Sequence, residues 1–232
     1  MDQNSSEEIY KQALLDHLLN FVTEKRNALF EKVLSNRTKH VTVVLEDIYQ
    51  SQNASAVLRS CDITGVQNVH IIENNYKYSI NPDVALGSFK WLNLIKYNEH
   101  DSNTIAAFDK LRSEGYRIVA TTPHKNDQNL DEISLDKKVA LVFGTELTGL
   151  SKIAIDNADE YLKIPMYGFT ESFNISVSAA LVLYNLTNKL RKSAINWHLT
   201  NEDKLDIKLE WAKRSIDRSD VIVRHFLKNY NS

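Results

Sequence analysis

Apolar residues recur at helical spacing near both ends of the chain. Between Ile9 and Leu34 they return every three or four positions, which predicts one or two amphipathic helices, and between Asn201 and Asn229 the same spacing predicts another helix or a pair. We expect terminal helical extensions, residues 1–40 and 192–232, around a central domain at 41–191. The positions expected to be buried in the extensions are Leu14, Leu15, Leu18, Phe21, Val22, Leu29, Phe30, Val33, Leu205, Leu209, Trp211, Ile216, Val221, Val223 and Phe226.

The middle of the chain alternates between strand and helix patterns. Val41 to Leu45 is a continuous, largely β-branched run, as buried parallel strands are, and a helix follows from an N-cap at Asn53 to a stop at Gly65. This alternation predicts an α/β fold, a parallel sheet with helices on both faces. The further expected elements are strands at 69–72, 91–97, 117–121, 139–143 and 161–164, and helices at 103–114, 151–158 and 174–191.

Length, charge and cysteine content restrict the class of protein. A chain of 232 residues with 43% hydrophobic residues suffices for one large domain with helical additions. The net charge of -2 gives no overall attraction for nucleic acid, so an RNA partner would need local basic surface. Cys61 is the only cysteine, which fits a reducing compartment, and no apolar run approaches the roughly 20 residues of a membrane span. With a polar start lacking a signal-peptide core, the chain is expected to be cytoplasmic.

Two glycine-bearing loops follow neighbouring strands. Residues 144–151 follow the strand at 139–143, and 165–174 follow the strand at 161–164. Pro165 ends strand pairing, and Ser172 or Asn174 can cap the next helix. Such strand ends bind ligands in parallel sheets, yet no Lys-Ser/Thr pair follows Gly149 and no Gly-x-Gly-x-x-Gly is present. A small-ligand pocket without an ordinary phosphate loop is expected.

Several side chains around these loops have two interpretations. Arg59 could fork onto an RNA phosphate or be a solvated helix residue, and Glu146 could be a general base or a cap or ion-pair partner. The apolar residues of 164–173 could hold an adenine ring and a sulfonium chain, or simply pack at a strand-to-helix turn. The seven histidines are scattered without metal-site spacing, so no metal is expected.

Three segments taken in order resemble a known family. They are Asn53–Arg59 with Gly65, Phe143–Glu146 with Gly149–Ser151, and Ile164–Met166 with Glu171–Val177, and they resemble the three motifs of the SpoU/TrmH branch of SPOUT methyltransferases. The likeness covers roughly 41–191, and Gly87–Trp91 is also similar to a segment of that branch. Thr145 and Phe173 depart from the asparagine and leucine that relatives often carry, which looks tolerable for a cofactor pocket.

The resemblance implies a fold with a deep trefoil knot, a homodimer whose active site draws on both chains, and S-adenosyl-L-methionine as the methyl donor. It places Arg59 as the catalytic residue, where we expect it to clamp a phosphate and help to deprotonate the 2'-hydroxyl. Asn53, Glu146, Ser172 and Asn174 would support that chemistry. The implied cofactor-binding residues are Thr121, Gly144, Ile164, Met166, Ser172 and Phe173.

The resemblance also implies 2'-O-methylation of a tRNA ribose, with the D-loop guanosine at tRNA position 18 as the expected target. Residues 189–232 contain ten Lys or Arg and six Asp or Glu, and this excess of positive charge could bind RNA. Helix faces that are merely exposed to solvent would show the same excess. Arg59, Lys90, Arg191 and Lys192 are the expected RNA contacts. The alternatives are methylation of ribosomal RNA or of another tRNA nucleoside, and a non-catalytic knotted RNA-binding protein. A small-molecule α/β enzyme is disfavoured by the missing phosphate loops.

Overall fold

The computed structural model describes residues 3–122 and 128–230, which form two compact units. One unit is Thr38–Trp197, and the other combines Met1–Arg37 with His198–Ser232. Both terminal extensions thus contribute to a single unit. The domain limits at 40 and 191 stay a prediction from the sequence.

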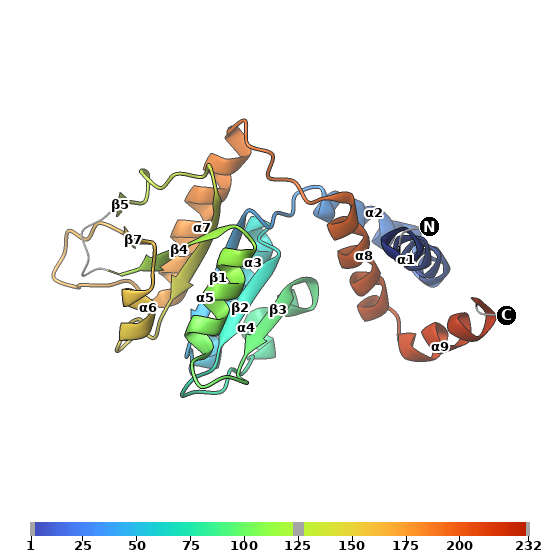
Figure 1. Ribbon diagram of the computed structural model, residues 1–232, viewed down its shortest axis with the longest axis horizontal. Helices are drawn as coiled ribbons and strands as arrows, with labels where there is room; N and C mark the ends of the chain where they lie inside the picture. Colours follow the sequence, from blue (N-terminus) through green and yellow to red (C-terminus); the bar gives the residue numbers. More distant parts are fainter. Residues whose placement is uncertain (1–2, 123–127, 231–232) are drawn as a thin grey trace. The chain divides into compact units, whose positions relative to one another are not determined.

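The central unit is built on a seven-stranded sheet with the order β3-β2-β1-β6-β4-β7-β5 (Figure 1). Every neighbouring pair of strands is parallel, which confirms the predicted parallel sheet. β1 lies between β2 and β6, and all of its residues are buried, as expected of an uninterrupted apolar run. The strands are β1 (Val41–Glu46), β2 (Asn68–Ile72), β3 (Asn93–Tyr97), β4 (Tyr116–Thr121), β5 (Gln128–Asn129), β6 (Lys138–Phe143) and β7 (Glu160–Lys163).

Helices cover both faces of this sheet, because successive strand residues point to opposite sides. Val43 belongs to a core cluster with residues of α3 and α7, whereas its neighbour Val44 belongs to a cluster with residues of α5 and α6. Figure 1 shows α5 crossing one face of the sheet, and the α/β prediction holds. The helical elements of this unit are α3 (Ser51–Thr64), α4 (Pro82–Ala85), the 3-10 turn η1 (Ser88–Trp91), α5 (Asn103–Ser113), α6 (Lys152–Asp156) and α7 (Ile175–Lys192).

Some ends of elements differ from the sequence prediction. Asn53 was expected to cap its helix, but α3 begins two residues earlier with Gln50 at the cap position. Asn53 therefore lies in the first turn, with its side chain available to other elements. The strand expected from 91 begins at Asn93 because Ser88–Trp91 forms the 3-10 turn, whereas Asn174 caps α7 as predicted, with Oδ1 accepting from the Ser176 amide at 2.8 Å.

The terminal unit consists of α1 (Gln3–Leu19), α2 (Glu24–Leu34), α8 (Asn201–Ser215) and α9 (Ser219–Tyr230), so each extension is a pair of helices. Leu14, Leu15 and Leu18 of α1 pack with Leu209 and Ala212 of α8. No helix in the described part of the chain is both long and apolar enough to cross a bilayer.

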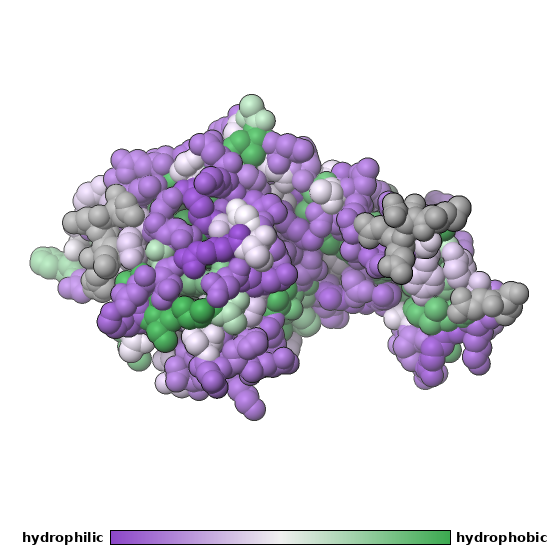
Figure 2. Space-filling view, in the orientation of Figure 1, coloured by the Kyte–Doolittle hydropathy of each residue, from purple (hydrophilic) through white to green (hydrophobic). Residues whose placement is uncertain are grey.

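Three residues expected in the core of this unit are exposed instead. Phe21 is 54% exposed because α1 ends before it, Leu29 is 47% exposed although the next residue, Phe30, is buried, and Val221 is 52% exposed in the first turn of α9. Helical spacing identifies the apolar face of a helix, but it does not show where along the helix that face stops packing against another element. In the view of Figure 2 most of the surface is hydrophilic, and the hydrophobic residues form separate patches.

Candidate active site

The loops after β6 and β7 border a cavity of about 390 Å³ at the carboxyl end of the sheet. This volume lies within the ~300–1,000 Å³ of small-ligand sites. The wall is mixed, with apolar side chains such as Phe143 and Phe173 beside the polar Thr121 and Ser172. Its lining consists of Thr121, Thr122, residues 143–150, Ile155, residues 171–173, Ile175 and Ser178.

The first loop closes tightly on itself. The Thr145 amide donates to the Gly149 carbonyl at 3.0 Å, and the Gly149 amide donates back to the Thr145 carbonyl at 3.1 Å. A Cβ on Gly144 would lie 2.2 Å from the Gly149 carbonyl oxygen, closer than any side chain tolerates. Only glycine fits at 144, and the cavity wall here is therefore largely backbone.

Glu46 anchors the far end of the same loop. Its carboxylate is 2% exposed and accepts hydrogen bonds from the Ser151 amide at 2.9 Å, the Ser151 hydroxyl at 2.8 Å and the Thr104 hydroxyl at 2.6 Å. The Ser151 oxygen in turn accepts from the Ala154 amide and caps α6. Sequence reasoning missed this residue, although an acidic residue closing a mainly apolar, wholly buried strand was the available signal.

Three of the expected site residues meet beside the cavity. The Asn174 side-chain amide donates to Asn53 Oδ1 at 3.1 Å and also to a carboxylate oxygen of Glu146. They come from the N-terminus of α7, the first turn of α3 and the loop after β6. Because the Asn174 oxygen is held by the Ser176 amide, its nitrogen is directed at both partners. This orients the Glu146 carboxylate at the edge of the cavity.

Arg59 stands apart from this group. It is exposed on α3 and does not line the cavity, and its side chain makes no hydrogen bond or ion pair within residues 3–122 and 128–230. An unengaged guanidinium on the surface is available to a substrate phosphate or to a second copy of the chain.

The expected cofactor residues divide into two groups. Thr121, Gly144, Ser172 and Phe173 line the cavity, and the Thr121 hydroxyl is oriented by donating to the Val142 carbonyl at 2.8 Å. Ile164 packs against the core cluster of α3 and α7 instead, and the half-buried Met166 is not among the lining residues that the structure describes. Residues 147–150 also line the cavity, although the sequence did not single them out as cofactor contacts. The loop that contains them is closed by backbone hydrogen bonds, which leave no pattern of side chains in the sequence.

The expected RNA contacts also differ in their surroundings. Arg191 donates to the Thr64 carbonyl at 2.8 Å, and its guanidinium lies 5.5 Å from the centre of the Trp197 ring. Burial lowers the pKa of Arg191. These contacts tie Arg191 into the fold, whereas Lys90 and Lys192 are exposed.

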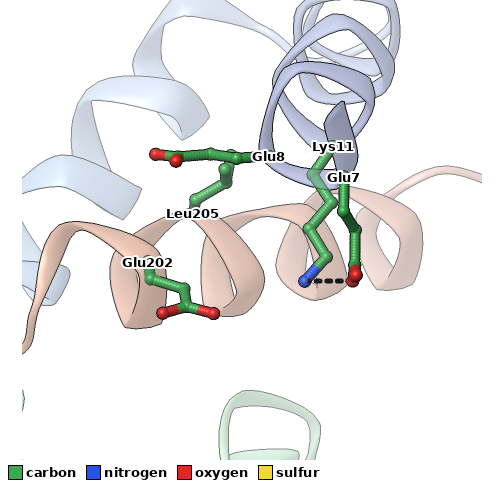
Figure 3. A pocket seen from close by; sticks show the side chains of 5 residues that line it. All are labelled: Glu7, Glu8, Lys11, Glu202 and Leu205. Atoms are coloured by element: carbon green, nitrogen blue, oxygen red, sulfur yellow. Dashed lines mark ion pairs between the residues drawn. The ribbon is translucent and has the colours of Figure 1, made fainter. Parts of the chain in front are cut away.

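A separate hollow lies between α1 and α8 in the terminal unit (Figure 3), lined by Glu7, Glu8, Lys11, Glu202 and Leu205. Lys11 lies 3.0 Å from Asp206 and 3.0 Å from Glu7, and the hydrogen bonds that its ammonium group donates to these carboxylates raise its pKa. The remaining glutamates make this surface unsuited to RNA phosphate. Within the described ranges, no group of three or more His, Cys, Asp or Glu side chains is placed to hold a metal ion.

Comparisons with known proteins agree on one family. The model of the SpoU rRNA Methylase family matches residues 40–184. A tRNA (guanosine(18)-2'-O)-methyltransferase of Borreliella burgdorferi is 48% identical over 205 residues, which is 88% of this chain and 92% of that protein. The enzyme of the same description from Thermus thermophilus is 33% identical over 174 residues, covering 75% of this chain and 87% of its own.

Solved structures give the same result. The Aquifex aeolicus TrmH/SpoU tRNA modifying enzyme superposes with a TM-score of 0.74 at 30% identity, covering 84% of this chain and 98% of that one. The SpoU methyltransferase AviRb of Streptomyces viridochromogenes, solved in complex with AdoMet, gives a TM-score of 0.57 at 18% identity over 70% of this chain and 62% of its own, which shows a shared fold.

Proposed function

This chain belongs to the SpoU rRNA methylase family, and from that membership we propose that it transfers the methyl group of S-adenosyl-L-methionine to a ribose 2'-hydroxyl of tRNA, at the D-loop guanosine 18. The two relatives that carry this description align with this chain over most of their own length. The observation that carries the proposal is the meeting of Asn53, Glu146 and Asn174 beside a cavity walled by glycine-rich backbone.

The cavity fits the proposed donor in size and in chemistry. Gly144 allows the first loop to close against its own backbone and so to form the cavity wall, and Phe173 offers an apolar surface to an adenine ring. Thr121 and Ser172 provide hydroxyls for its polar groups, while Ile164 packs against the core at the start of the second loop. When bound, the donor supplies a methyl group already activated by a positively charged sulfur.

The protein has to position the ribose and accept its proton. A 2'-hydroxyl is a poor nucleophile near neutral pH, so it needs a neighbouring acceptor and an in-line geometry. Asn174, which also donates to Asn53, holds the Glu146 carboxylate at the cavity edge, and Ser172 lies on the opposite loop. We assign Arg59 to a phosphate beside the target ribose, where its charge also favours loss of the hydroxyl proton.

Because Arg59 does not reach the cavity of its own chain, we propose a homodimer in which it serves the partner's site. On α7, Val177, Leu181 and Tyr184 are 44%, 43% and 69% exposed, and their spacing puts them on one face. This uncovered apolar stripe lies on the helix that packs against α3, which carries Arg59. A second copy covering the stripe would bring its Arg59 close to the first chain's loops.

Two further features of the family extend the proposal. A trefoil knot is implied by the resemblance, and it is supported by the path from β7, between β4 and β5, back to α7 beside α3. We also place the protein in the cytoplasm, in keeping with its single buried cysteine and its tRNA substrate.

The test is methyl transfer to defined RNAs. The protein is incubated with S-adenosyl-L-methionine and either unmodified bulk tRNA or ribosomal RNA transcripts, and mass spectrometry locates the product. We expect 2'-O-methylguanosine at tRNA position 18 and nothing on ribosomal RNA. A product on ribosomal RNA alone would show that the substrate is ribosomal RNA, as the family's description states, and would contradict the tRNA assignment. No transfer to any RNA, with RNA still bound, would indicate a non-catalytic RNA-binding protein.

A further inference from the structure

We infer that Tyr49 and Tyr76 form a site for an unstacked base of the RNA substrate, next to the transfer site. This inference rests on the proposed function. The two rings have their centroids 5.1 Å apart with 44° between their planes. They are 39% and 51% exposed, so each offers aromatic surface to solvent.

The pair lies beside the predicted catalytic residues. Tyr49 lines a small hollow together with Asn53, Thr145 and Glu146. Gln50 links Tyr49 to Asn53. Its side-chain oxygen accepts a hydrogen bond from the side-chain amide of Asn53, and its side-chain nitrogen lies 3.5 Å from the Tyr49 hydroxyl. A base resting on Tyr49 would therefore have its ribose within reach of the trio.

A buried carboxylate holds the backbone of the segment that carries Tyr76. Asp47, 7% exposed, accepts from the amides of Asn74 and Asn75, each at 2.8 Å, and from the amide of Tyr76 at 3.3 Å. Asp47 also precedes Tyr49 by two residues and has a φ of 53°, which is uncommon outside glycine. Asp47 thus links the backbone next to Tyr49 with the segment that carries Tyr76.

The segment carrying Tyr76 has no helix or strand of its own, yet it is held at two points. Besides the contacts to Asp47, the Glu73 carboxylate accepts from the Tyr78 amide at 2.8 Å and from Asn98 at 2.9 Å. A loop fixed in this way presents its aromatic ring without a large ordering cost on binding.

The chemistry of the pair favours a nucleobase. Bases turned out of RNA loops are bound by stacking on aromatic side chains, and an enzyme that acts on a nucleoside inside a folded loop has to expose it. The larger cavity, proposed for the methyl donor, includes neither tyrosine in its lining. The two uncharged rings also suit a base better than a phosphate.

The experiment compares single and double substitutions at Tyr49 and Tyr76 to leucine with the matched substitutions to phenylalanine. Leucine keeps the bulk and loses the aromatic face, whereas phenylalanine keeps the face. We expect the leucine variants to raise the KM for tRNA about ten-fold, within the range given by loss of one base stack, and to leave the Kd for S-adenosyl-L-methionine unchanged. The phenylalanine variants should restore the wild-type KM.

A second measurement uses the unaltered protein. Tyrosine-to-base crosslinks formed by ultraviolet light in the tRNA complex are mapped by mass spectrometry, and we expect them in peptides containing Tyr49 or Tyr76. Leucine variants with an unchanged KM, or crosslinks confined to other peptides, would overturn the inference. A wild-type protein that methylates no RNA would instead defeat the proposed function.

Discussion

At the scale of single residues, Gly144 gives the sharpest test of the cavity. We predict that Gly144→Ala raises the Kd for S-adenosyl-L-methionine at least ten-fold, because its Cβ would meet the Gly149 carbonyl at 2.2 Å and force the loop apart. Gly168→Ala is the matched control, since its Cβ would meet nothing within 4 Å. Calorimetric titration of both variants with the donor measures the difference, and equal affinities would show that the loop does not form the donor site.

Glu46 should act on the same loop through Ser151. We predict that Glu46→Ala lowers the free energy of unfolding by about 2–3 kcal/mol, because the buried Thr104 hydroxyl and the two half-buried donors of Ser151 lose their acceptor. The donor's affinity should fall as well, since the carboxylate fixes the end of the loop. The exposed Glu99 provides the control, and Glu99→Ala should leave both quantities unchanged. Urea titration measures the free energy of unfolding, and a binding assay measures the donor affinity. If neither changes in Glu46→Ala, Glu46 does not anchor the loop.

These residues show what the sequence could and could not indicate. Asn174 was predictable, because an asparagine before a helical pattern is a good cap, and it does cap α7. The contact from Asn174 to Asn53 spans 121 positions and depends on the packing of α7 against α3, which no local pattern encodes. The roles of Glu46 and Asp47 were not predicted from the sequence for a similar reason, because their hydrogen-bond partners come from distant loops.

At the scale of elements, the pairing of β2 with β3 should make stability depend on pH. His70 of β2 is 1% exposed, and its Nδ1 lies 2.9 Å from the Tyr97 hydroxyl on β3. Burial lowers the pKa of His70 from 6.5 to about 4, and the carboxylate of Glu114 offsets this only partly. The unfolded chain therefore binds more protons than the folded one between these pH values.

From that sign we predict that the free energy of unfolding falls as the pH drops from about 6.5 to 4. At 1.36 kcal/mol per pH unit the loss approaches about 3 kcal/mol. Replacing His70 by asparagine, which does not titrate, should flatten this part of the profile even if it destabilises the fold. Denaturant midpoints at several pH values measure both slopes, and parallel slopes would exclude His70 as the cause.

The elements themselves were largely predictable, because uninterrupted apolar runs between glycine and polar segments indicate buried parallel strands. The order of those strands was not. β1 pairs with β6 across nearly a hundred residues, and β7 comes to lie between β4 and β5. The two-residue β5 and the four-residue α4 are too short to leave a periodic pattern.

At the scale of the whole molecule, the question is whether one chain can supply a complete active site. The trio and the cavity belong to one chain, while Arg59 lies on α3 outside the cavity. The exposed stripe of Val177, Leu181 and Tyr184 on the neighbouring α7 offers the surface for a second copy. Closed two-fold dimers are the commonest assembly that such a stripe would form.

Complementation tests this arrangement directly. Arg59→Ala and Gly144→Ala, each expressed alone and assayed at a donor concentration well below the raised Kd of Gly144→Ala, should show little activity, for different reasons. Expressed together, half of the dimers would be mixed, and each mixed dimer would pair an intact Arg59 with an intact cavity across the interface. We predict recovery to about a quarter of wild-type tRNA methylation, since one of the two sites works in half of the dimers.

The opposite arrangement gives the opposite result. If Arg59 served the cavity of its own chain, every site in a mixed dimer would lack either the guanidinium or the donor, and co-expression would recover nothing. Because each parent variant carries one intact element, recovery also shows that both variants fold. The mixed dimers, isolated through different tags on the two chains, should carry all of the recovered activity.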